Sequence, residues 1–265
     1  MLKKIINYSV FPFESLKAFL KILISKTQKN KLVNKDITFN WDGQLFHGNP
    51  TGDVLVEKLF LRGFNEFAVT QWFDKYIKED MVVVDVGAHM GWSTLMMAKR
   101  VGSNGKVFAF EPSDYYRKML MKNIEVNRYS NIVVRDTALY SENGIKYFRL
   151  ENGTVADQKS DNTIEVNCEK FDTLQSELKL NQIDLIKIDI EGAELSCLLG
   201  MEEVLNKYKP ILIIEVHTQY LKQRGHSSRK LIEFLEKKSY DIRPFDVSKN
   251  EMLTTDQFCY HLIAF

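Results

Sequence analysis

The sequence predicts an α/β fold: a Rossmann-like, mostly parallel sheet with helices on both faces and an antiparallel hairpin at its C-terminal end. The first observation is a regular alternation of apolar strand patterns and helical patterns that begins at Met81. The second is the run Met81–Val84, which is β-branched and uninterrupted, as expected of a strand covered on both faces. The third is the pair of strand patterns at 240–247 and 258–265, which a loop joins instead of a helix. These two strands should pair antiparallel at the sheet edge.

The other elements follow from local patterns along the chain. Residues 13–24 carry apolar side chains at helical spacing, and the turn dipeptide Asp42-Gly43 predicts a hairpin between 37–41 and 44–47. Residues 53–78 are expected to be mostly helical. Strands are expected near 81–85, 106–110, 131–135, 183–189 and 211–217, with helices near 92–101, 114–127 and 192–207. An inserted antiparallel pair is expected at 145–150 and 163–168, joined by the polar segment 151–162.

Length and composition limit the kinds of protein that this chain can be. The chain of 265 residues is long enough for one large α/β domain, which we place at 51–265 after an extension of residues 1–50. Its 36 basic and 35 acidic residues give a net charge of +1, so we expect no nucleic-acid partner. The three cysteines form neither a zinc motif nor a disulfide framework, which indicates a reducing, cytoplasmic setting.

The N-terminal segment is basic and amphipathic. Lysines interrupt its apolar residues, so we expect neither a signal peptide nor a membrane span. Packing of this helix on the domain or on a second subunit, as in a homodimer, is the favoured interpretation. The alternative is peripheral contact of residues 1–31 with the inner face of an anionic membrane.

The segment Asp85–Gly91 predicts a ligand-binding turn between a strand and a helix. The amides at a helix start favour a negative ligand group. The glycines are spaced G-x-x-x-G, unlike the G-x-G-x-x-G of dinucleotide sites, and the acid Asp85 would repel a diphosphate but hold an ammonium group. S-adenosylmethionine, which carries an amino and a carboxylate group, suits this corner better. Glu111 ends the next strand at the spacing of an acid that binds ribose hydroxyls. The alternative is that both acids are helix N-caps.

Polar side chains follow the later strands as well. In an open α/β sheet, ligands bind at the carboxyl ends of the strands, so these side chains are candidates for the site. They are Asp136, Lys187, Asp189, Glu191, Glu215 and His217. The alternative is a structural ion network with a helix cap at Glu191.

Several motifs stand along the chain: DVGAHMGWSTL, VFAFEP, the helix with Asn123 and Asn127, TALYSENG, LIKIDIEGAELSCLLG and PILIIEVH. Together they resemble the FkbM family of S-adenosylmethionine-dependent methyltransferases. The resemblance covers roughly residues 60–220, and KIDIEGAE is its most specific part. It implies a class I methyltransferase fold, S-adenosylmethionine as cofactor, and O-methylation of a hydroxyl on a sugar, glycan or polyketide-type small molecule.

The resemblance also implies roles for individual residues. At the cofactor, Asp85, Gly87 and Gly91 would contact the methionine end, and Glu66 its ammonium group. Glu111 would bind the ribose, and Asp136 and Ala138 would lie at the adenine. His89 is a further cofactor-binding candidate and stands where the family usually has asparagine. Asp189 and Glu191 would face the methyl group and the acceptor. Asp189 is the first choice for the general base and His217 the second, with Lys187 orienting Asp189 or lowering the acceptor's pKa.

Other functions stay open at this point. No metal is expected, and the alternative is a divalent ion held by Asp189, Glu215 and His217, with Glu191 as a further ligand. An NAD-dependent oxidoreductase would share the first βαβ unit but not the glycine spacing. An RNA methyltransferase would need a basic patch, and a non-catalytic scaffold would have no reason to keep acids at successive strand ends. The acceptor itself should contact residues 1–50, 151–162 and 218–229.

Overall fold

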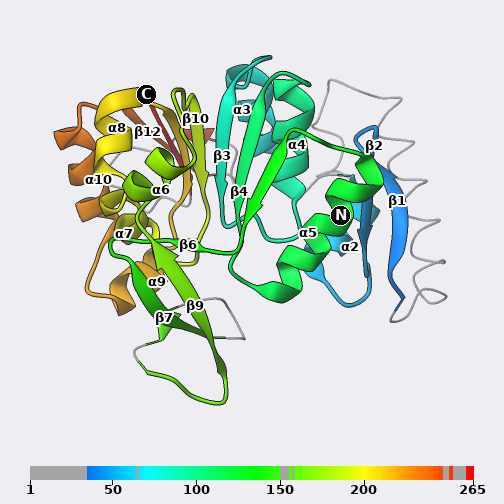
Figure 1. Cartoon of the computed structure of the whole chain (residues 1–265), viewed down its shortest axis with the longest axis horizontal. Helices are drawn as coiled ribbons and strands as arrows, with labels where there is room; N and C mark the ends of the chain where they lie inside the picture. Colours follow the sequence, from blue (N-terminus) through cyan, green and yellow to red (C-terminus); the bar gives the residue numbers. More distant parts are fainter. Residues whose placement is uncertain (1–34, 64–65, 150–154, 157, 247–250, 253–260) are drawn as a thin grey trace. The chain divides into compact units, whose positions relative to one another are not determined.

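The computed structural model describes residues 35–63, 66–149, 155–156, 158–246, 251–252 and 261–265 (Figure 1). The chain forms two compact units, one ending at Phe67 and one starting at Ala68. The predicted boundary after residue 50 remains an expectation. The predicted helix at 13–24 lies outside the described residues, so its contact with a membrane or a second subunit stays a prediction. Among the described residues, no helix combines the length and the apolarity needed to cross a bilayer.

The first unit contains the predicted hairpin and one helix. Asp42 and Gly43 both have positive φ, 49° and 71°, and thus form the tight turn that the sequence predicted. Phe39 packs against Phe46 and Phe60, with ring centroids 6.0 and 5.2 Å apart. The elements are β1 (Ile37–Trp41), β2 (Gln44–Gly48) and α2 (Val54–Arg62).

The second unit is built on an eight-stranded sheet of order β13-β12-β14-β11-β10-β3-β4-β5. Its strands are β3 (Val82–Val86), β4 (Lys106–Phe110), β5 (Ile132–Arg135), β10 (Leu185–Ile188), β11 (Ile211–Glu215), β12 (Ile242–Asp246), β13 (Glu251–Met252) and β14 (His261–Ala264). The five strands from β11 to β5 are parallel, whereas β14 pairs antiparallel with both β11 and β12. The predicted sheet with its antiparallel C-terminal end is confirmed.

The strand order reverses between β3 and β10. From β3 the chain builds outward through β4 and β5, and it returns to add β10 and β11 on the other side of β3. Such a reversal is where open α/β sheets place their ligands, outside the carboxyl ends of the strands. Asp85 and Lys187 are register partners across this boundary.

Helices cover the sheet between the strands. They are α3 (Phe67–Tyr76), α4 (Trp92–Val101), α5 (Asp114–Asn127), α6 (Phe171–Glu177), α7 (Glu194–Leu199), α8 (Glu202–Tyr208), α9 (Thr218–Gln223) and α10 (Ser228–Lys237). In Figure 1, α4 and α5 lie beside β3 and β4, and α7, α8 and α10 lie beside β10 and β12. The strands between them bury apolar side chains completely, among them Val84, Ile186 and Leu212.

The single helix predicted over 192–207 is wrong, because α7 and α8 are separate. Gly200 lies against the backbone of Tyr140, and a Cβ there would be 1.8 Å from the Tyr140 carbonyl oxygen. The chain therefore turns at this close approach before α8 begins. Helix α10 was not predicted; Ser227 caps it by accepting a hydrogen bond from the Lys230 amide.

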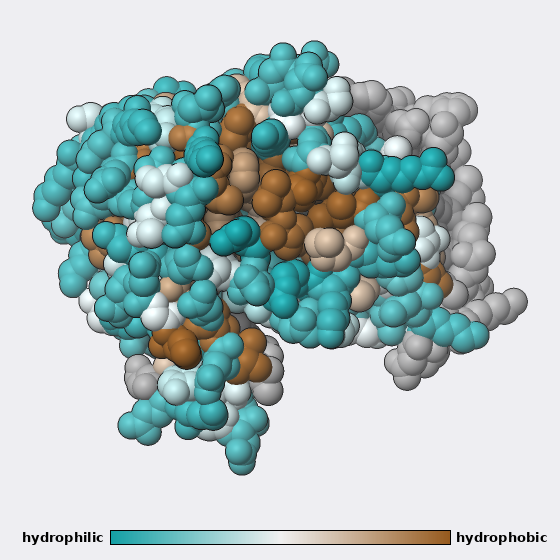
Figure 2. Space-filling view, viewed as in Figure 1, coloured by the Kyte–Doolittle hydropathy of each residue, from teal (hydrophilic) through white to brown (hydrophobic). Residues whose placement is uncertain are grey.

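The inserted antiparallel pair belongs to a second sheet of four strands, in the order β6-β9-β7-β8. These are β6 (Ala138–Leu139), β7 (Gly144–Arg149), β8 (Val155–Ala156) and β9 (Thr163–Glu169). β7 and β9 project from the large sheet in Figure 1, and Figure 2 shows a hydrophobic area at the base of this projection. Ala138, Phe148, Val166 and Cys168 form a small core here. Cys168 and Cys197 are buried and free, and Cys259 lies outside the described residues.

Candidate functional site

Asp85 holds the beginning of helix α4 to strand β3. Its carboxylate is fully buried and accepts hydrogen bonds from the Ser93 and Thr94 hydroxyls at 2.7 and 2.6 Å. The Lys187 ammonium lies 3.8 Å from its other oxygen. These partners turn the carboxylate towards the protein interior, beneath the glycine turn.

The turn after β3 brings two strand ends into close contact. Gly87 has φ +81°, and a Cβ on it would lie 2.0 Å from the Asp189 carbonyl oxygen. Gly91 has φ +95°, and a Cβ on it would lie 2.6 Å from the end of the Leu120 side chain. Asn123 fastens the turn from α5 by donating a hydrogen bond to the Met90 carbonyl at 3.0 Å. At positions 87 and 91, only glycine fits without displacing the neighbouring atoms.

Glu111, directly after β4, is a buried carboxylate bound by two backbone amides. The amides of His89 and Ser113 each donate to one of its oxygens at 2.8 Å. Burial raises its pKa from 4.5 to about 7 and outweighs the two amide hydrogen bonds, which act in the opposite direction. The His89 ring, whose residue has φ +50°, lies over Tyr116 with ring centroids 3.7 Å apart.

Asp189, directly after β10, forms an ion pair with Lys187. The Lys187 ammonium donates to the Asp189 carboxylate at 3.1 Å and is itself almost completely buried. Burial favours the neutral form of Asp189, but the charges of Lys187 and His217 outweigh it and hold the pKa at about 2. Asp189 is therefore ionised at neutral pH, and Lys187 joins it to Asp85 below.

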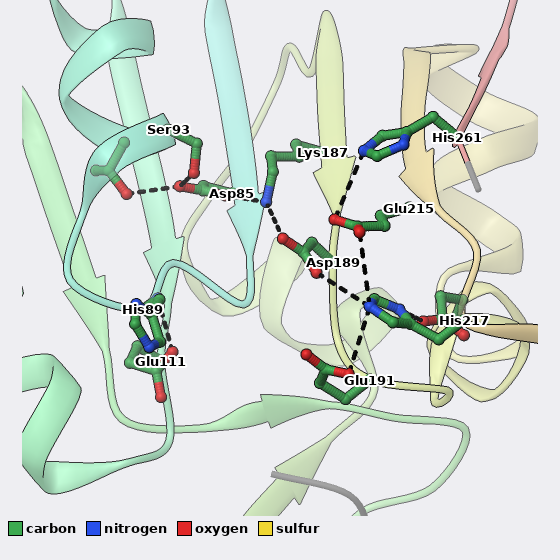
Figure 3. A network of polar contacts seen from close by, with 12 residues as sticks. Asp85, His89, Ser93, Glu111, Lys187, Asp189, Glu191, Glu215, His217 and His261 are labelled. Atoms are coloured by element: carbon green, nitrogen blue, oxygen red, sulfur yellow. Dashed lines mark hydrogen bonds and ion pairs between the residues drawn. The ribbon is translucent and has the colours of Figure 1, made fainter. Parts of the chain in front are cut away.

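His217 lies after β11 among four carboxylates (Figure 3). Its Nδ1 is 2.7 Å from the Glu194 carboxylate. Its Nε2 is 3.4, 3.8 and 3.9 Å from oxygens of Glu191, Glu215 and Asp189, respectively. Burial would lower its pKa, but the hydrogen bond to Glu194 and the surrounding negative charges raise it to about 10. The imidazole is thus a cation at neutral pH.

Glu191 differs from Asp189 in both exposure and ionisation. Its side chain is 42% exposed, and its residue has φ +49°, a conformation uncommon for a side chain of this kind. Burial of part of the carboxyl raises its pKa, and the nearby charge of His217 only partly offsets this. Glu191 is therefore both the more accessible and the more basic of these two acids.

A cavity of about 370 Å³ opens over these strand ends. Its wall comprises Gly87, His89, Glu111, Pro112, Ser113, Tyr116, Phe148, Arg149, Ile164, Val166, Asp189, Ile190 and Glu191. A smaller cavity shares Gly87, Pro112, Phe148 and Ile190 with it and is also lined by Ala138. The cavity thus extends from the Glu111 side of the sheet to the carboxylates after β10.

The structure brings together some of the predicted site residues and separates others. Gly87, His89, Glu111, Asp189 and Glu191 line the larger cavity. Residues predicted for the site that do not line it are Asp85, which is buried, Gly91, Asp136, which is exposed, Lys187 and His217. Glu66 belongs to the first unit, so its predicted contact with a cofactor stays a prediction.

Three residues of the site were not predicted from the sequence: Glu194, Tyr116 and Arg149. Glu194 is fully buried, yet it binds His217. The signal was present, since Glu194 is the last residue of KIDIEGAE, two positions after a glycine. Arg149 lines the cavity from β7, and nothing in the strand pattern distinguished it.

The alternative metal ligands also lie together. One ligand atom from each of Asp189, Glu215 and His217 falls within 4.8 Å of the others, so their spacing is compatible with a cation. Asp189 and Glu215 also form ion pairs with His217, at 3.9 and 3.8 Å from its Nε2.

The family comparison identifies a methyltransferase domain. Residues 85–242 match the family model described as "Methyltransferase FkbM domain". The chain belongs to the FkbM methyltransferase family, which confirms the resemblance seen in its motifs.

Two curated relatives are named as methyltransferases. "Methyltransferase 1" of Beauveria bassiana is 23% identical over 59% of this chain and 72% of its own length. "Methyltransferase sdnD" of Sordaria araneosa is 28% identical over 46% of this chain and 60% of its own length. Among solved structures, the FkbM methyltransferase of Methylobacillus flagellatus has a TM-score of 0.47 and 16% identity, over 94% of this chain and 60% of its own.

Proposed function

We propose that this protein is an S-adenosylmethionine-dependent O-methyltransferase whose acceptor is a hydroxyl of a sugar, glycan or polyketide-type small molecule. The observation that carries the proposal is one cavity lined by Gly87 and Glu111 on one side and by Asp189 and Glu191 on the other. An acid placed to bind the ribose and two carboxylates placed near the reacting groups thus line a single cavity.

The charges of the cavity wall favour this cofactor over a nicotinamide dinucleotide. Three of the lining side chains, Glu111, Asp189 and Glu191, are carboxylates, against the single guanidinium of Arg149. A diphosphate would be repelled by such a wall, whereas a sulfonium cation would be attracted. The amides of His89 and Ser113 orient the Glu111 carboxylate for the ribose hydroxyls.

At the methionine end of the cofactor, the backbone of the turn forms the binding surface, and the Asp85 side chain does not. Gly87 lines the cavity without a side chain, and a Cβ on it would lie 2.0 Å from the Asp189 carbonyl oxygen, so glycine allows the two strand ends to approach this closely. The buried Asp85 fixes the start of α4, whose amides favour a negative group. Asp85 therefore supports this end of the cofactor indirectly.

Bound S-adenosylmethionine would supply a methyl group on a positively charged sulfur. The protein has to align an acceptor hydroxyl in line with that methyl group and take up the hydroxyl proton. Glu191 is the proton acceptor that we propose, because it lines the cavity, is accessible and has a raised pKa. This revises the sequence-based order of Asp189 first and His217 second.

Asp189 and His217 then have electrostatic roles. Asp189 is a weak base because Lys187 and His217 hold its pKa at about 2. Its negative charge at the cavity wall would stabilise a cationic methyl donor. His217, as a cation 3.4 Å from Glu191, would keep that side chain turned towards the acceptor.

The experiment that tests the proposal uses methyl-deuterated S-adenosylmethionine. The purified protein is incubated with small-molecule extracts, and products are analysed by mass spectrometry. A product that carries one deuterated methyl group in place of a hydroxyl hydrogen supports O-methylation. Labelling of nitrogen or carbon would contradict it, and labelling of RNA would favour the alternative acceptor. The Glu191→Gln variant serves as the control for background transfer.

A further inference from the structure

Glu194 is a buried carboxylate to which the proposed chemistry assigns no role. It is the first residue of α7 and has no exposed surface. Its Oε1 accepts two hydrogen bonds, from the Gly192 amide at 2.8 Å and from His217 Nδ1 at 2.7 Å. A single oxygen atom thus ties the turn after β10 to the residue that follows β11.

This double contact constrains the groups that face the cavity. The Gly192 amide belongs to the turn that carries Glu191 and Asp189. Oε1 of Glu194 accepts from the Gly192 amide, and with this oxygen as acceptor Nδ1 of His217 is the donor of the second contact, which fixes which ring nitrogen carries a proton. The Nε2 atom is then left facing Glu191 and Asp189.

We propose that Glu194 is a positioning residue: through its contact with Nδ1 it orients the His217 ring so that Nε2 faces Glu191 and Asp189, and it fixes the turn that presents those carboxylates. The inference deepens the proposed function and rests on it for its catalytic consequence.

A capping role alone does not account for this geometry. A cap of the turn would need only the Gly192 amide, yet the contact to His217 is the shorter of the two. It is also the shortest ion pair that His217 makes. The groups facing the ring are Asp189 and Glu191 after β10, Glu194 on α7, Glu215 on β11 and Tyr220 on α9. Lys187 and His261 are one contact further from the ring, because Lys187 pairs with Asp189 and His261 pairs with Glu215.

The first test examines the protein without any ligand. ¹⁵N NMR of the histidine rings reports which nitrogens are protonated, and the His217→Gln variant identifies the His217 signals among those of the five histidines. We expect Nδ1 to be protonated throughout and the imidazolium to persist above neutral pH. A wild-type His217 with an unprotonated Nδ1 would overturn the proposal, and this result needs no variant of Glu194 to fold.

The second test compares variants of Glu194. Glu194→Gln should move the His217 titration to lower pH and reduce kcat by about 10- to 100-fold, the size expected for a hydrogen bond to a charged group. The KM for S-adenosylmethionine should stay unchanged. Glu194→Asp, which keeps the charge, should recover part of the titration shift and of kcat. An unaltered titration and kcat in Glu194→Gln would refute the positioning role.

The matched control is Asp172→Asn. Asp172 also binds two groups at a helix start, the amides of Glu203 and Val204 at 3.1 and 3.0 Å, but it is not among the carboxylates that pair with His217. It should lose stability without any change in the His217 titration. If no methyl transfer is found with any acceptor, the NMR result still decides the role of Glu194, so the two proposals fail separately.

Discussion

Replacement of Glu111 by glutamine gives the sharpest test of the cofactor site. The carboxylate accepts one amide hydrogen bond on each oxygen, from Ser113 and His89. Glutamine has only one acceptor oxygen, so its NH₂ group would face one of these amides, and a buried donor would lose its partner. The ribose hydroxyls would also lose their charged acceptor, and since a hydrogen bond to a charged group contributes about 1.5–3 kcal/mol, affinity for S-adenosylmethionine should fall about 10- to 100-fold.

The same residue predicts a pH dependence of binding. The pKa of Glu111 is raised from 4.5 to about 7, which at about 1.4 kcal/mol per pH unit corresponds to about 3 kcal/mol in favour of the neutral form. In the free protein this group binds more protons when folded than when unfolded. Its contribution to stability therefore falls as pH rises between 4.5 and 7. Ribose hydroxyls prefer the ionised form, so cofactor binding should weaken as pH falls below about 7.

Isothermal titration calorimetry at pH 6 and pH 8 measures both effects. In wild type, binding near pH 7 should release protons, visible as a dependence of the heat on the buffer, and Glu111→Gln should abolish that release. Glu125→Gln is a suitable control, because Glu125 is exposed on α5 and pairs only with Lys122 among the contacts that the structure describes. Unchanged affinity in Glu111→Gln, or affinity that rises as pH falls, would refute the reasoning.

Three further outcomes are expected. Glu191→Gln should lower kcat by about 100-fold or more, the size of general-base catalysis, while calorimetry shows unchanged cofactor affinity; a loss of affinity instead would make Glu191 a binding residue. Gly87→Ala should lower the free energy of unfolding in urea by about 2 kcal/mol or more, because the new Cβ clashes with the Asp189 carbonyl in addition to the cost of positive φ. Gly63→Ala is the control, since Gly63 has nearly the same φ, +80°, but open space around its Cβ position. Equal losses of stability in the two variants would contradict the clash. Methyl transfer should persist after dialysis against a chelator, and loss of activity restored by a divalent metal would favour the cation alternative.

Much of the fold could be predicted because its patterns are local. The run ending at Asp85 is apolar because β3 is covered on both faces, and Asp42-Gly43 supplies the positive φ that a tight turn needs. The break between α7 and α8 could not be predicted. It depends on the backbone of Tyr140 approaching Gly200, a contact between segments distant in sequence.

In the candidate site, too, local features could be predicted, whereas those that depend on contacts in the folded structure could not. The strand-end motifs located Glu111, Asp189 and Glu191 because parallel strands bring their carboxyl ends to one edge. The sequence did not reveal that Ser93 and Thr94 would turn Asp85 inwards. Ionisation was also out of reach, since the pKa of His217 depends on how closely Asp189, Glu191 and Glu194, which follow β10, approach a residue that follows the next strand.

A titration of the purified chain with S-adenosylmethionine and, separately, with NAD measures directly which cofactor the cavity binds. We predict saturable binding of S-adenosylmethionine that weakens in Glu111→Gln, and no binding of NAD. Saturable binding of NAD, or S-adenosylmethionine binding that is indifferent to Glu111, would contradict this prediction.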